Sequence, residues 1–353
     1  MSNPLRIGII GLVHDHIWDN LPFLQGHKDA EIVAVADSNE ELLARFQKEY
    51  ECHNAYENPD DLISNEDLDA IYVYESNSMG AQIAEIALSN GLHVLIEKPI
   101  ASTLEEADDM LAAARQSGSR LMINWPLAWW PQLQHAITLA QTGSIGRIWQ
   151  VKYRAAHAGP KELGCSDYFC SWLFDPLENG GGALMDYCCY GALLARTIMG
   201  MPSKVTAMKG RFCKESITVE DNALLALTYH DGMATAEASW TQIDKMTAYT
   251  TLIYGSEGTL MIEPRDGGKL LKATADAPDG VEVEVPPLAP EQSNSADHFI
   301  HCLQSGEAFT PLCQDRIGRD TQEILEAGTQ AAEEGVCIGL PLTQTLPEPH
   351  RYS

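Results

Sequence analysis

The sequence predicts an α/β protein with an N-terminal doubly wound parallel sheet and a C-terminal α+β domain built on a mainly antiparallel sheet. Short apolar strands alternate with helices of about ten residues up to residue 124, which is typical of consecutive βαβ units. Strands dominate from residue 125 onward. At 353 residues the chain can form two domains, and we expect them at 1–124 and 125–345, followed by a C-terminal tail at 346–353.

Apolar runs bounded by turn residues predict the strands of the N-terminal part, and the segments between them predict its helices. The expected strands are 6–11, 31–37, 70–74, 94–96 and 120–124. The expected helices are 16–25, 40–48, 81–89 and one that begins at Thr103. Ligands of open α/β sheets bind outside the carboxyl ends of the strands, so the residues that follow these strands are the first candidates for a functional site.

Alternation of apolar and polar residues, as in Val205–Cys213, predicts a C-terminal sheet with one solvated or partner-facing side. Its expected strands are 147–157, 203–213, 223–230, 233–240, 248–255 and 258–263, with weaker candidates near 270 and 281. Its expected helices are 131–142, 183–199 and 320–334. The segment Gly255-Ser256-Glu257-Gly258 predicts a hairpin turn. A sheet with an exposed face favours a homodimer or homotetramer.

Composition narrows the class of protein. The net charge of −27 argues against nucleic acid and anionic membrane surfaces as partners. No apolar run approaches the roughly 20 residues that span a bilayer, and the N-terminus lacks the layout of a secretory signal. The nine cysteines are an odd number without a CxxC pair, which suits reduced thiols better than a disulfide framework. We therefore expect a cytoplasmic protein.

The turn after the first strand is a candidate dinucleotide site. Such a site requires glycines where the backbone approaches the pyrophosphate. Gly11 is the first glycine of a G-x-G-x-x-G pattern, but Val13 and His16 stand at the other two positions. Asp37 ends the second strand, where an acid binds a ribose hydroxyl pair. No Arg adjoins it, which favours NAD over NADP because a 2′-phosphate would be repelled. Alternatively, Asp37 is a helix N-terminal acid that interacts with the helix dipole.

The run His14-Asp15-His16 offers metal-ligating side chains. Three consecutive residues rarely converge on one ion, so we expect no metal there. A role for His14 and His16 beside a phosphate or a substrate is favoured instead. The alternative is ordinary turn polarity.

Lys98 follows the apolar strand 94–96 in the sequence Glu97-Lys98-Pro99. Pro99 biases Lys98 away from the helical region, so the strand ends where the Lys projects. This position is where a cofactor and a substrate would meet. A solvated Lys at a strand end is the alternative.

The crossover out of the first sheet is rich in tryptophan. Trp125, Trp129 and Trp130 follow Asn124 within six residues. These rings either stack on the apolar face of a sugar or fill a core between the domains.

A second polar group follows three glycines, Gly180-Gly181-Gly182, which let backbone run close to another group. Asp186 and Tyr190 are four residues apart and share one face of the predicted helix. A carboxylate and a phenol on one face can bind a hydroxyl and exchange its proton, and Trp172 precedes them near the same site. The alternative is a buried Tyr whose hydroxyl contacts Asp186 for structure alone.

Taken in order, the glycine turn, the acid after the second strand, Glu-Lys-Pro, and Gly-Gly-Gly followed by Asp and Tyr resemble the Gfo/Idh/MocA family of NAD(P)-dependent oxidoreductases. The resemblance runs from Arg6 to about Leu342, and its most specific segments are 87–99 and 172–200. It implies an N-terminal Rossmann domain and a C-terminal α+β domain with a large open sheet that is often used for oligomerisation. It implies NAD, with NADP less favoured, and a sugar, inositol or related polyol as the substrate.

The resemblance also implies roles for residues. Lys98 would contact the reacting hydroxyl and the nicotinamide ribose, Asp186 would orient the substrate, and Tyr190 takes a position usually held by His. Members similar to glucose–fructose oxidoreductase and dimeric dihydrodiol dehydrogenase also have Tyr there. Asn77 and Glu97 fall on cofactor-binding positions, whereas Asn124 falls near the substrate.

Several positions depart from the family pattern. The two later glycines of the turn are missing, and Glu75-Ser76 stands in place of Thr-Pro. Trp125-Pro126 stands in place of an Arg, Cys188 in place of a Gly, and Leu193 in place of an Asp.

Three functions follow for testing. The first is an NAD-dependent oxidoreductase that transfers a hydride from a CH–OH carbon, with Tyr190 accepting the hydroxyl proton and Lys98 assisting. The second uses bound NAD transiently, so that oxidation of a sugar ring permits elimination of a glycosidic bond without net redox change. The third is a non-catalytic ligand-binding protein that has lost the cofactor.

Overall fold

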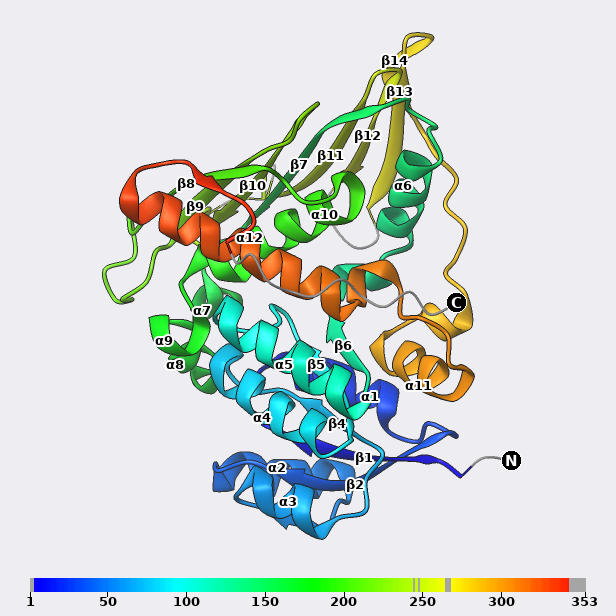
Figure 1. The fold of residues 1–353 in the computed structure, drawn as a ribbon, viewed down its shortest axis with the longest axis vertical. Helices are drawn as coiled ribbons and strands as arrows, with labels where there is room; N and C mark the ends of the chain where they lie inside the picture. Colours follow the sequence, from blue (N-terminus) through cyan, green and yellow to red (C-terminus); the bar gives the residue numbers. More distant parts are fainter. Residues whose placement is uncertain (1–2, 244, 247, 264–267, 343–353) are drawn as a thin grey trace.

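The computed structural model describes residues 3–243, 245–246, 248–263 and 268–342. The predicted tail at 346–353 lies outside this part of the chain. Figure 1 shows a parallel sheet with its helices in the lower half and a large twisted sheet in the upper half. The long helix α12 (Asp315–Glu334) runs between the two halves. The predicted fold class is confirmed.

The N-terminal sheet has six strands in the order β3-β2-β1-β4-β5-β6, and every pair is parallel. The order reverses between β1 and β4, which creates the crevice where ligands of such sheets bind. Two short elements, β3 and α3, were not predicted. The strands are β1 (Leu5–Ile10), β2 (Ala30–Ala36), β3 (Ala55–Tyr56), β4 (Ala70–Val73), β5 (His93–Glu97) and β6 (Leu121–Asn124). The helices are α1 (His16–Leu24), α2 (Glu40–Tyr50), α3 (Pro59–Asn65), α4 (Asn77–Ser89) and α5 (Leu104–Ser117).

The C-terminal sheet has nine strands in the order β14-β13-β12-β11-β7-β10-β9-β8-β15. Among the described strand pairs of this sheet, only the central pair β7 and β10 is parallel, and the predicted hairpin joins β11 and β12. The strands are β7 (Ile148–Ala156), β8 (Lys204–Gly210), β9 (Asn222–Thr228), β10 (Met233–Ser239), β11 (Tyr249–Gly255), β12 (Gly258–Glu263), β13 (Lys269–Thr274), β14 (Ala277–Glu282) and β15 (Ile338–Gly339).

Helices pack on one face of this sheet, where α6, α10 and α12 lie in Figure 1. Side chains along β9 alternate between buried and half-buried, as expected for a sheet with one covered face. The helices are α6 (Pro131–Gln141), α7 (Pro160–Leu163), α8 (Asp167–Leu173), α9 (Pro176–Asn179), α10 (Cys189–Met199) and α11 (Ser295–Ser305). Short helical turns are η1 (Pro126–Trp129), η2 (Leu184–Cys188), η3 (Pro290–Gln292) and η4 (Pro311–Cys313).

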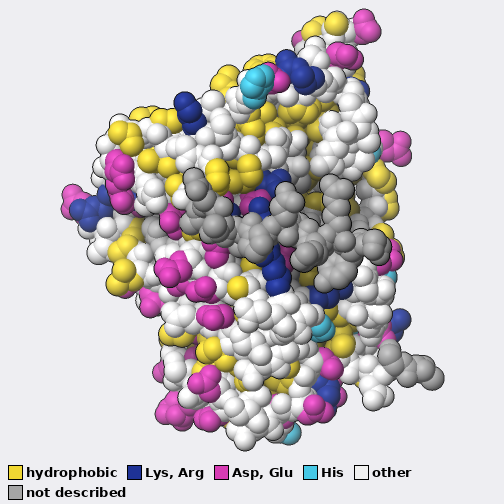
Figure 2. All heavy atoms as spheres, in the orientation of Figure 1, with side chains coloured by type: hydrophobic (Ala, Val, Ile, Leu, Met, Phe, Trp, Pro, Cys, Tyr) yellow, Lys and Arg dark blue, Asp and Glu magenta, His cyan; other side chains and the backbone are white. Residues whose placement is uncertain are grey.

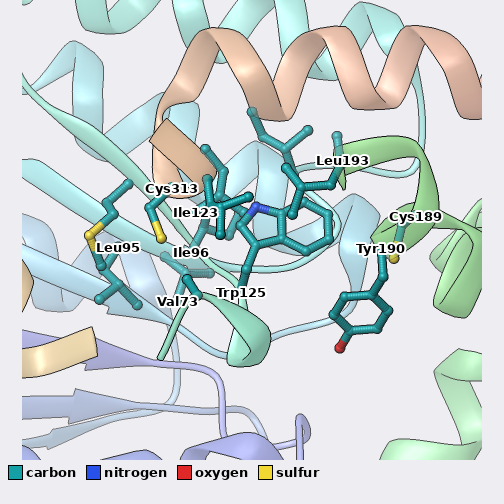
Figure 3. Packing of buried hydrophobic residues seen from close by; sticks show 14 of the residues in the cluster. Val73, Leu95, Ile96, Ile123, Trp125, Cys189, Tyr190, Leu193 and Cys313 are labelled. Carbon is teal, nitrogen blue, oxygen red and sulfur yellow. The ribbon is translucent and has the colours of Figure 1, made fainter. Parts of the chain in front are cut away.

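One continuous apolar core joins the two halves. Trp125 is fully buried at their junction, with Ile96 and Ile123 on one side and Leu193 of α10 on the other (Figure 3). The sequence left open whether this ring stacks on a ligand or fills a core, and the structure places it in the core. A Trp at this position buries a large apolar surface.

The surface is predominantly acidic. Asp and Glu side chains are spread over the lower half of the face shown in Figure 2, in keeping with the net charge of −27. Among the described residues, no helix combines the length and the apolar character that a membrane span requires.

Candidate functional site

A cavity of about 580 Å³ opens between the carboxyl edge of the parallel sheet and the start of α10. It brings together several side chains that the sequence singled out, and they come from both halves of the chain. These are His16, Lys98, Asn124, Trp129, Asp186 and Tyr190. The predicted end-of-strand position of Lys98 therefore faces the predicted Asp/Tyr group, although the two are separated by 88 residues in sequence.

A buried ion pair lies at the floor of this cavity. Nζ of Lys98 donates to Oδ1 of Asp186 at 2.7 Å and to the backbone oxygen of Asp186 at 3.3 Å. Burial opposes a charge on Lys98, but the Asp186 carboxylate outweighs that effect and holds the pKa of Lys98 well above its ordinary value. Lys98 therefore remains an ammonium at neutral pH, able to stabilise negative charge on a substrate oxygen.

Asp186 is held from two sides. The indole Nε1 of Trp240 donates to its Oδ2 at 3.2 Å. The backbone of Asp186 belongs to η2, a π-helical turn that precedes α10. The sequence predicted an uninterrupted helix from 183 to 199 instead. Such turns are frequent at functional sites. Asp186 and Tyr190 still reach the same cavity, so the spacing prediction holds despite the different local geometry.

Two of the three glycines before this turn, Gly180 and Gly182, lie against protein backbone. A side chain on Gly180 would overlap the carbonyl oxygen of Ser102, and one on Gly182 would overlap that of Glu220. Oε1 of Glu220 accepts the backbone N–H groups of Gly182 and Leu184 at 2.7 and 3.0 Å. The glycines thus allow the helix start to dock closely, and Glu220 satisfies its free N–H groups.

Tyr190 lies directly beside the ion pair. Nζ of Lys98 is 5.2 Å from the centre of its ring, and the ring packs edge-on against Trp125 at 5.7 Å. Its hydroxyl points away from the packed side chains around Trp125 (Figure 3). The phenol is thereby held between the interdomain core and the cavity.

A chain of polar contacts crosses the opposite wall. Nδ1 of His16 lies 2.9 Å from Oε2 of Glu97, and Nδ2 of Asn124 donates to Oε1 of the same carboxylate at 2.6 Å. The indole Nε1 of Trp129 then donates to Oδ1 of Asn124 at 3.0 Å. Trp129 therefore lines the cavity with its ring and orients Asn124 with its nitrogen.

His14 and Trp172 pack together outside the cavity lining. His14 is 1% exposed and its ring lies 4.9 Å from that of Phe169 and 5.4 Å from that of Trp172. Burial, with His16 and Lys98 nearby, holds the pKa of His14 well below its usual value. Trp172, expected near the substrate, thus packs against the β1–α1 turn.

Between the two histidines, Asp15 points to the second half of the chain. Its carboxylate accepts the backbone N–H and the hydroxyl of Ser166 at 2.7 and 2.5 Å. This contact joins the β1–α1 turn to the residue that caps α8.

The adenosine end of the crevice fits a dinucleotide. Gly11 has φ of +82°, and a side chain there would overlap the backbone of Tyr74, so the tight turn toward α1 requires glycine. Asp37 stands at the carboxyl end of β2, where its two oxygens accept the N–H groups of Leu12 and Asn39 at 2.6 Å each. Each oxygen keeps a second lone pair, so a ribose hydroxyl pair can still be bound. Val13 packs against the apolar core beside this turn.

Two further residues shape this edge. Nδ2 of Asn77, at the start of α4, donates to Oδ1 of Asn179 at 2.8 Å, which links the expected ribose-binding position to α9. Glu75 follows β4, and burial raises its pKa to about 7, with Asp37 and Glu178 nearby adding to the effect. Glu75 therefore titrates near neutrality, at a position where the family pattern has Thr.

Sequence reasoning missed several residues of the cavity and of its support. Trp240 and Glu220 hold the Asp186 turn, and Tyr187, His157 and Phe169 line the cavity. None belongs to a motif with a fixed spacing to Lys98 or Asp186. Tyr187 alone had a local signal, because it adjoins Asp186.

Comparison with known proteins places both halves of the chain. Residues 5–125 match the model of an oxidoreductase family with an NAD-binding Rossmann fold, and residues 133–261 match the GFO/IDH/MocA C-terminal domain. The chain is 27% identical over 352 residues to D-apiose dehydrogenase of Paraburkholderia graminis, covering 94% of this chain and 88% of that protein. It is 24% identical over 327 residues to scyllo-inositol 2-dehydrogenase (NADP(+)) of Bacillus subtilis, covering 86% and 89%.

Solved structures show the same fold. Levoglucosan dehydrogenase in complex with NADH and levoglucosan superposes with a TM-score of 0.82 at 22% identity, over 96% of this chain and all of that one. Aldose-aldose oxidoreductase from Caulobacter crescentus superposes with a TM-score of 0.81 at 24% identity, again over 96% of this chain and all of that one. With both family models matched in order along one chain, the protein belongs to the Gfo/Idh/MocA family of NAD(P)-dependent oxidoreductases.

Proposed function

We propose that the protein transfers a hydride between NAD and a CH–OH carbon of a sugar, inositol or related polyol bound in the cavity. The observation that carries this proposal is the buried Lys98–Asp186 pair beside Tyr190, at the carboxyl end of β5. A charged donor, a carboxylate that holds it and a phenol meet at the point where a cofactor and a substrate would meet.

NAD supplies the hydride acceptor when it is bound. The protein's own side chains divide the remaining work. The Lys98 ammonium donates to the substrate oxygen and stabilises its developing negative charge. Asp186 keeps Lys98 charged and in place, through Oδ1 at 2.7 Å. When the alcohol is oxidised, Tyr190 accepts the hydroxyl proton on its phenolate oxygen, and in the reverse direction the phenol returns this proton to the substrate.

The lining of the cavity favours a neutral polyol of about monosaccharide size. Trp129 and Trp130 offer apolar faces on which a sugar ring can stack. Asp15 and Asp19 are acidic groups that also line the cavity, so a phosphorylated or carboxylated sugar would be disfavoured. The relatives that are named for D-apiose and scyllo-inositol support this class of substrate.

NAD is proposed over NADP because Asp37 would repel a 2′-phosphate. A reducing compartment, the cytoplasm, is proposed because all nine cysteines are free thiols. A homodimer or homotetramer is proposed because Met208 within β8 and Phe212 just beyond its end are 66% and 73% exposed.

Cofactor binding and turnover test the proposal. We would titrate the purified protein with NAD⁺ and NADP⁺ by calorimetry, and then follow NADH formation with a panel of neutral, phosphorylated and carboxylated sugars and inositols. Tighter binding of NAD⁺ and turnover of a neutral polyol are expected. Lys98→Met should lose turnover, whereas Lys28→Met, which removes an exposed Lys on the surface, should keep it.

Two outcomes would contradict the proposal. Absence of binding of either dinucleotide would overturn the redox function. Release of a sugar from a glycoside without NADH formation would instead indicate that the cofactor is oxidised and reduced within one catalytic cycle.

A further inference from the structure

Three metal-ligating side chains converge beside the cavity, and one of them, His16, belongs to its lining. His14 and His16 come from the turn between β1 and α1, and Glu97 ends β5. One potential ligand atom from each lies within 4.8 Å of the other two. His14 and Glu97 are buried, at 1% and 3% exposed, while the His16 side chain is 30% exposed.

The chain path explains why this group differs from the consecutive run His14-Asp15-His16. Asp15 turns toward Ser166, where its carboxylate caps the start of α8. The two histidines on either side of it turn the other way, with ring centres 4.6 Å apart. Glu97, distant in sequence, takes the place that Asp15 would have occupied in a local site.

We propose that His14, His16 and Glu97 form a binding site for a first-row divalent cation such as Zn²⁺. Two histidines and one glutamate are a ligand set found in zinc sites that keep further positions open. Metal–ligand distances near 2.1 Å in a tetrahedral site separate ligand atoms by about 3.4 Å. The 2.9 Å between Nδ1 of His16 and Oε2 of Glu97 is close to that separation for this pair, and the third ligand atom, on His14, lies within 4.8 Å of both.

The surroundings of Glu97 are those of an oriented ligand. Its second oxygen accepts from Nδ2 of Asn124 at 2.6 Å, and Asn124 is held in turn by the indole of Trp129. Hydrogen-bonded outer partners of this kind fix the direction of a ligating carboxylate and raise metal affinity.

The cavity supplies both a route of entry and the remaining ligands. His16 and Asn124 line it, so a cation can reach the site from solvent. His16 lines the same cavity as Lys98 and Asp186, so further ligands would come from that space. Water, or the hydroxyl oxygens of a bound polyol, would complete the coordination.

The test is metal binding by the whole protein after removal of bound metal with a chelator. Zn²⁺ is titrated by calorimetry, and Co²⁺ is added to a parallel sample because its visible absorption reports the coordination geometry. One Zn²⁺ per chain and a low-symmetry Co²⁺ spectrum are expected. Glu97→Gln, which preserves shape, and His16→Gln, at a partly exposed position, should each weaken Zn²⁺ binding by at least about 10-fold, since even loss of an outer partner costs that much.

The matched control is His27→Gln. His27 also lies beside a carboxylate, 3.3 Å from Asp297, but it is away from the cavity. The His27→Gln protein should bind Zn²⁺ with the affinity of the unaltered protein. Thermal unfolding of each variant shows whether it is folded, and His16→Gln keeps the test open if Glu97→Gln does not fold.

Two results would overturn the inference. One is the absence of stoichiometric Zn²⁺ binding by the unaltered protein. The other is binding that both cavity variants retain, which would place the cation on the cysteines or elsewhere. NAD⁺ titration of the same samples keeps this test separate from that of the proposed function, because a protein that binds NAD⁺ but not Zn²⁺ contradicts the metal site alone.

Discussion

The carboxylates at the two ends of the crevice are held in different ways. At the β2 end, Asp37 is bound by backbone N–H groups, and burial raises the pKa values of both Asp37 and Glu75. At the β5 end, Asp186 faces the ammonium of Lys98 and Glu97 faces the imidazole of His16. Acids at the first end are thus arranged for neutral donors such as ribose hydroxyls, whereas Asp186 at the second end belongs to a charged pair with Lys98 and Glu97 contacts the ring of His16.

This difference assigns cofactor recognition to the β2 end and the reaction itself to the β5 end. A carboxylate that lacks a cation can accept a hydroxyl pair and repel a phosphate, which is a selection between cofactors. A carboxylate that holds a cation fixes that charge at one point, which is what stabilisation of a transition state requires. Substitutions at each end test this separation.

Lys98→Met should have the largest effect, because it removes the only charge that the proposed mechanism places on the substrate oxygen. We expect kcat to fall by about 100- to 1,000-fold, the usual cost of removing one preorganised electrostatic donor. The free energy of unfolding should also fall by about 3–5 kcal/mol, because Asp186 remains buried without its partner. Steady-state kinetics and chemical denaturation measure the two effects.

A double variant separates these two effects. Lys98→Met with Asp186→Leu removes both charges, so much of the lost stability should return while activity does not. Unchanged turnover in the single variant would show that Lys98 has no role in the reaction.

Glu75→Gln tests the other end through pH. In the folded protein the carboxyl of Glu75 has a pKa of about 7, against an ordinary value of 4.5. The contribution of this bound proton to the free energy of unfolding is therefore fully present below pH 4.5 and is lost as the pH rises through 7. The shift corresponds to up to about 3 kcal/mol. Glu75→Gln should therefore be more stable than the unaltered protein at pH 8, and the advantage should shrink toward pH 5.

Denaturation curves at several pH values measure this difference. Glu85→Gln, at an exposed position on α4, is the matched control and should keep the pH dependence of the unaltered protein. Parallel curves for Glu75→Gln and the unaltered protein would mean that the carboxyl at Glu75 does not titrate near neutrality.

Asp37→Asn should reduce the preference for NAD⁺ over NADP⁺, and this effect should be smaller than the loss of turnover in Lys98→Met. The amide keeps an oxygen for the N–H of Leu12 but loses the charge and the acceptor for the N–H of Asn39, and a hydrogen bond to a charged group contributes about 1.5–3 kcal/mol. NAD⁺ affinity should fall by about 10- to 100-fold while NADP⁺ affinity falls less, so the preference narrows. Calorimetry measures both constants, and Glu40→Gln, an exposed acid at the start of α2, should leave their ratio unchanged.

The parallel sheet and the main residues of the cavity could be predicted from sequence because their signals are local. An apolar strand that ends in Glu-Lys-Pro places Lys98 at the sheet edge whatever the rest of the chain does. The spacing of Asp186 and Tyr190 likewise places both on one side of a helical segment, even though the turn is π-helical.

The supports of the site could not be predicted, because their partners are far apart in sequence. Trp240 reaches Asp186 across 54 residues, and Glu220 caps Gly182 across 38. His16 and Glu97 are separated by 81 residues, so only the folded sheet shows that Glu97 replaces Asp15 beside the histidines. The core position of Trp125 also depends on α10, which follows more than 60 residues later.

Trp129→Phe should have the smallest effect and should act on binding rather than on chemistry. The ring that faces the substrate is kept, but the Nε1 donor to Asn124 is lost, which costs about 0.5–1.5 kcal/mol. We expect KM for the polyol to rise by about 3- to 10-fold with kcat nearly unchanged, because the Lys98–Asp186 pair stays intact. Trp149→Phe, which loses an indole donor to Gly255 in the far sheet, is the matched control. A fall in kcat in the Trp129 variant alone would mean that the Asn124–Glu97 wall takes part in the chemical step, and that the division between the two ends of the crevice is less sharp than the charges suggest.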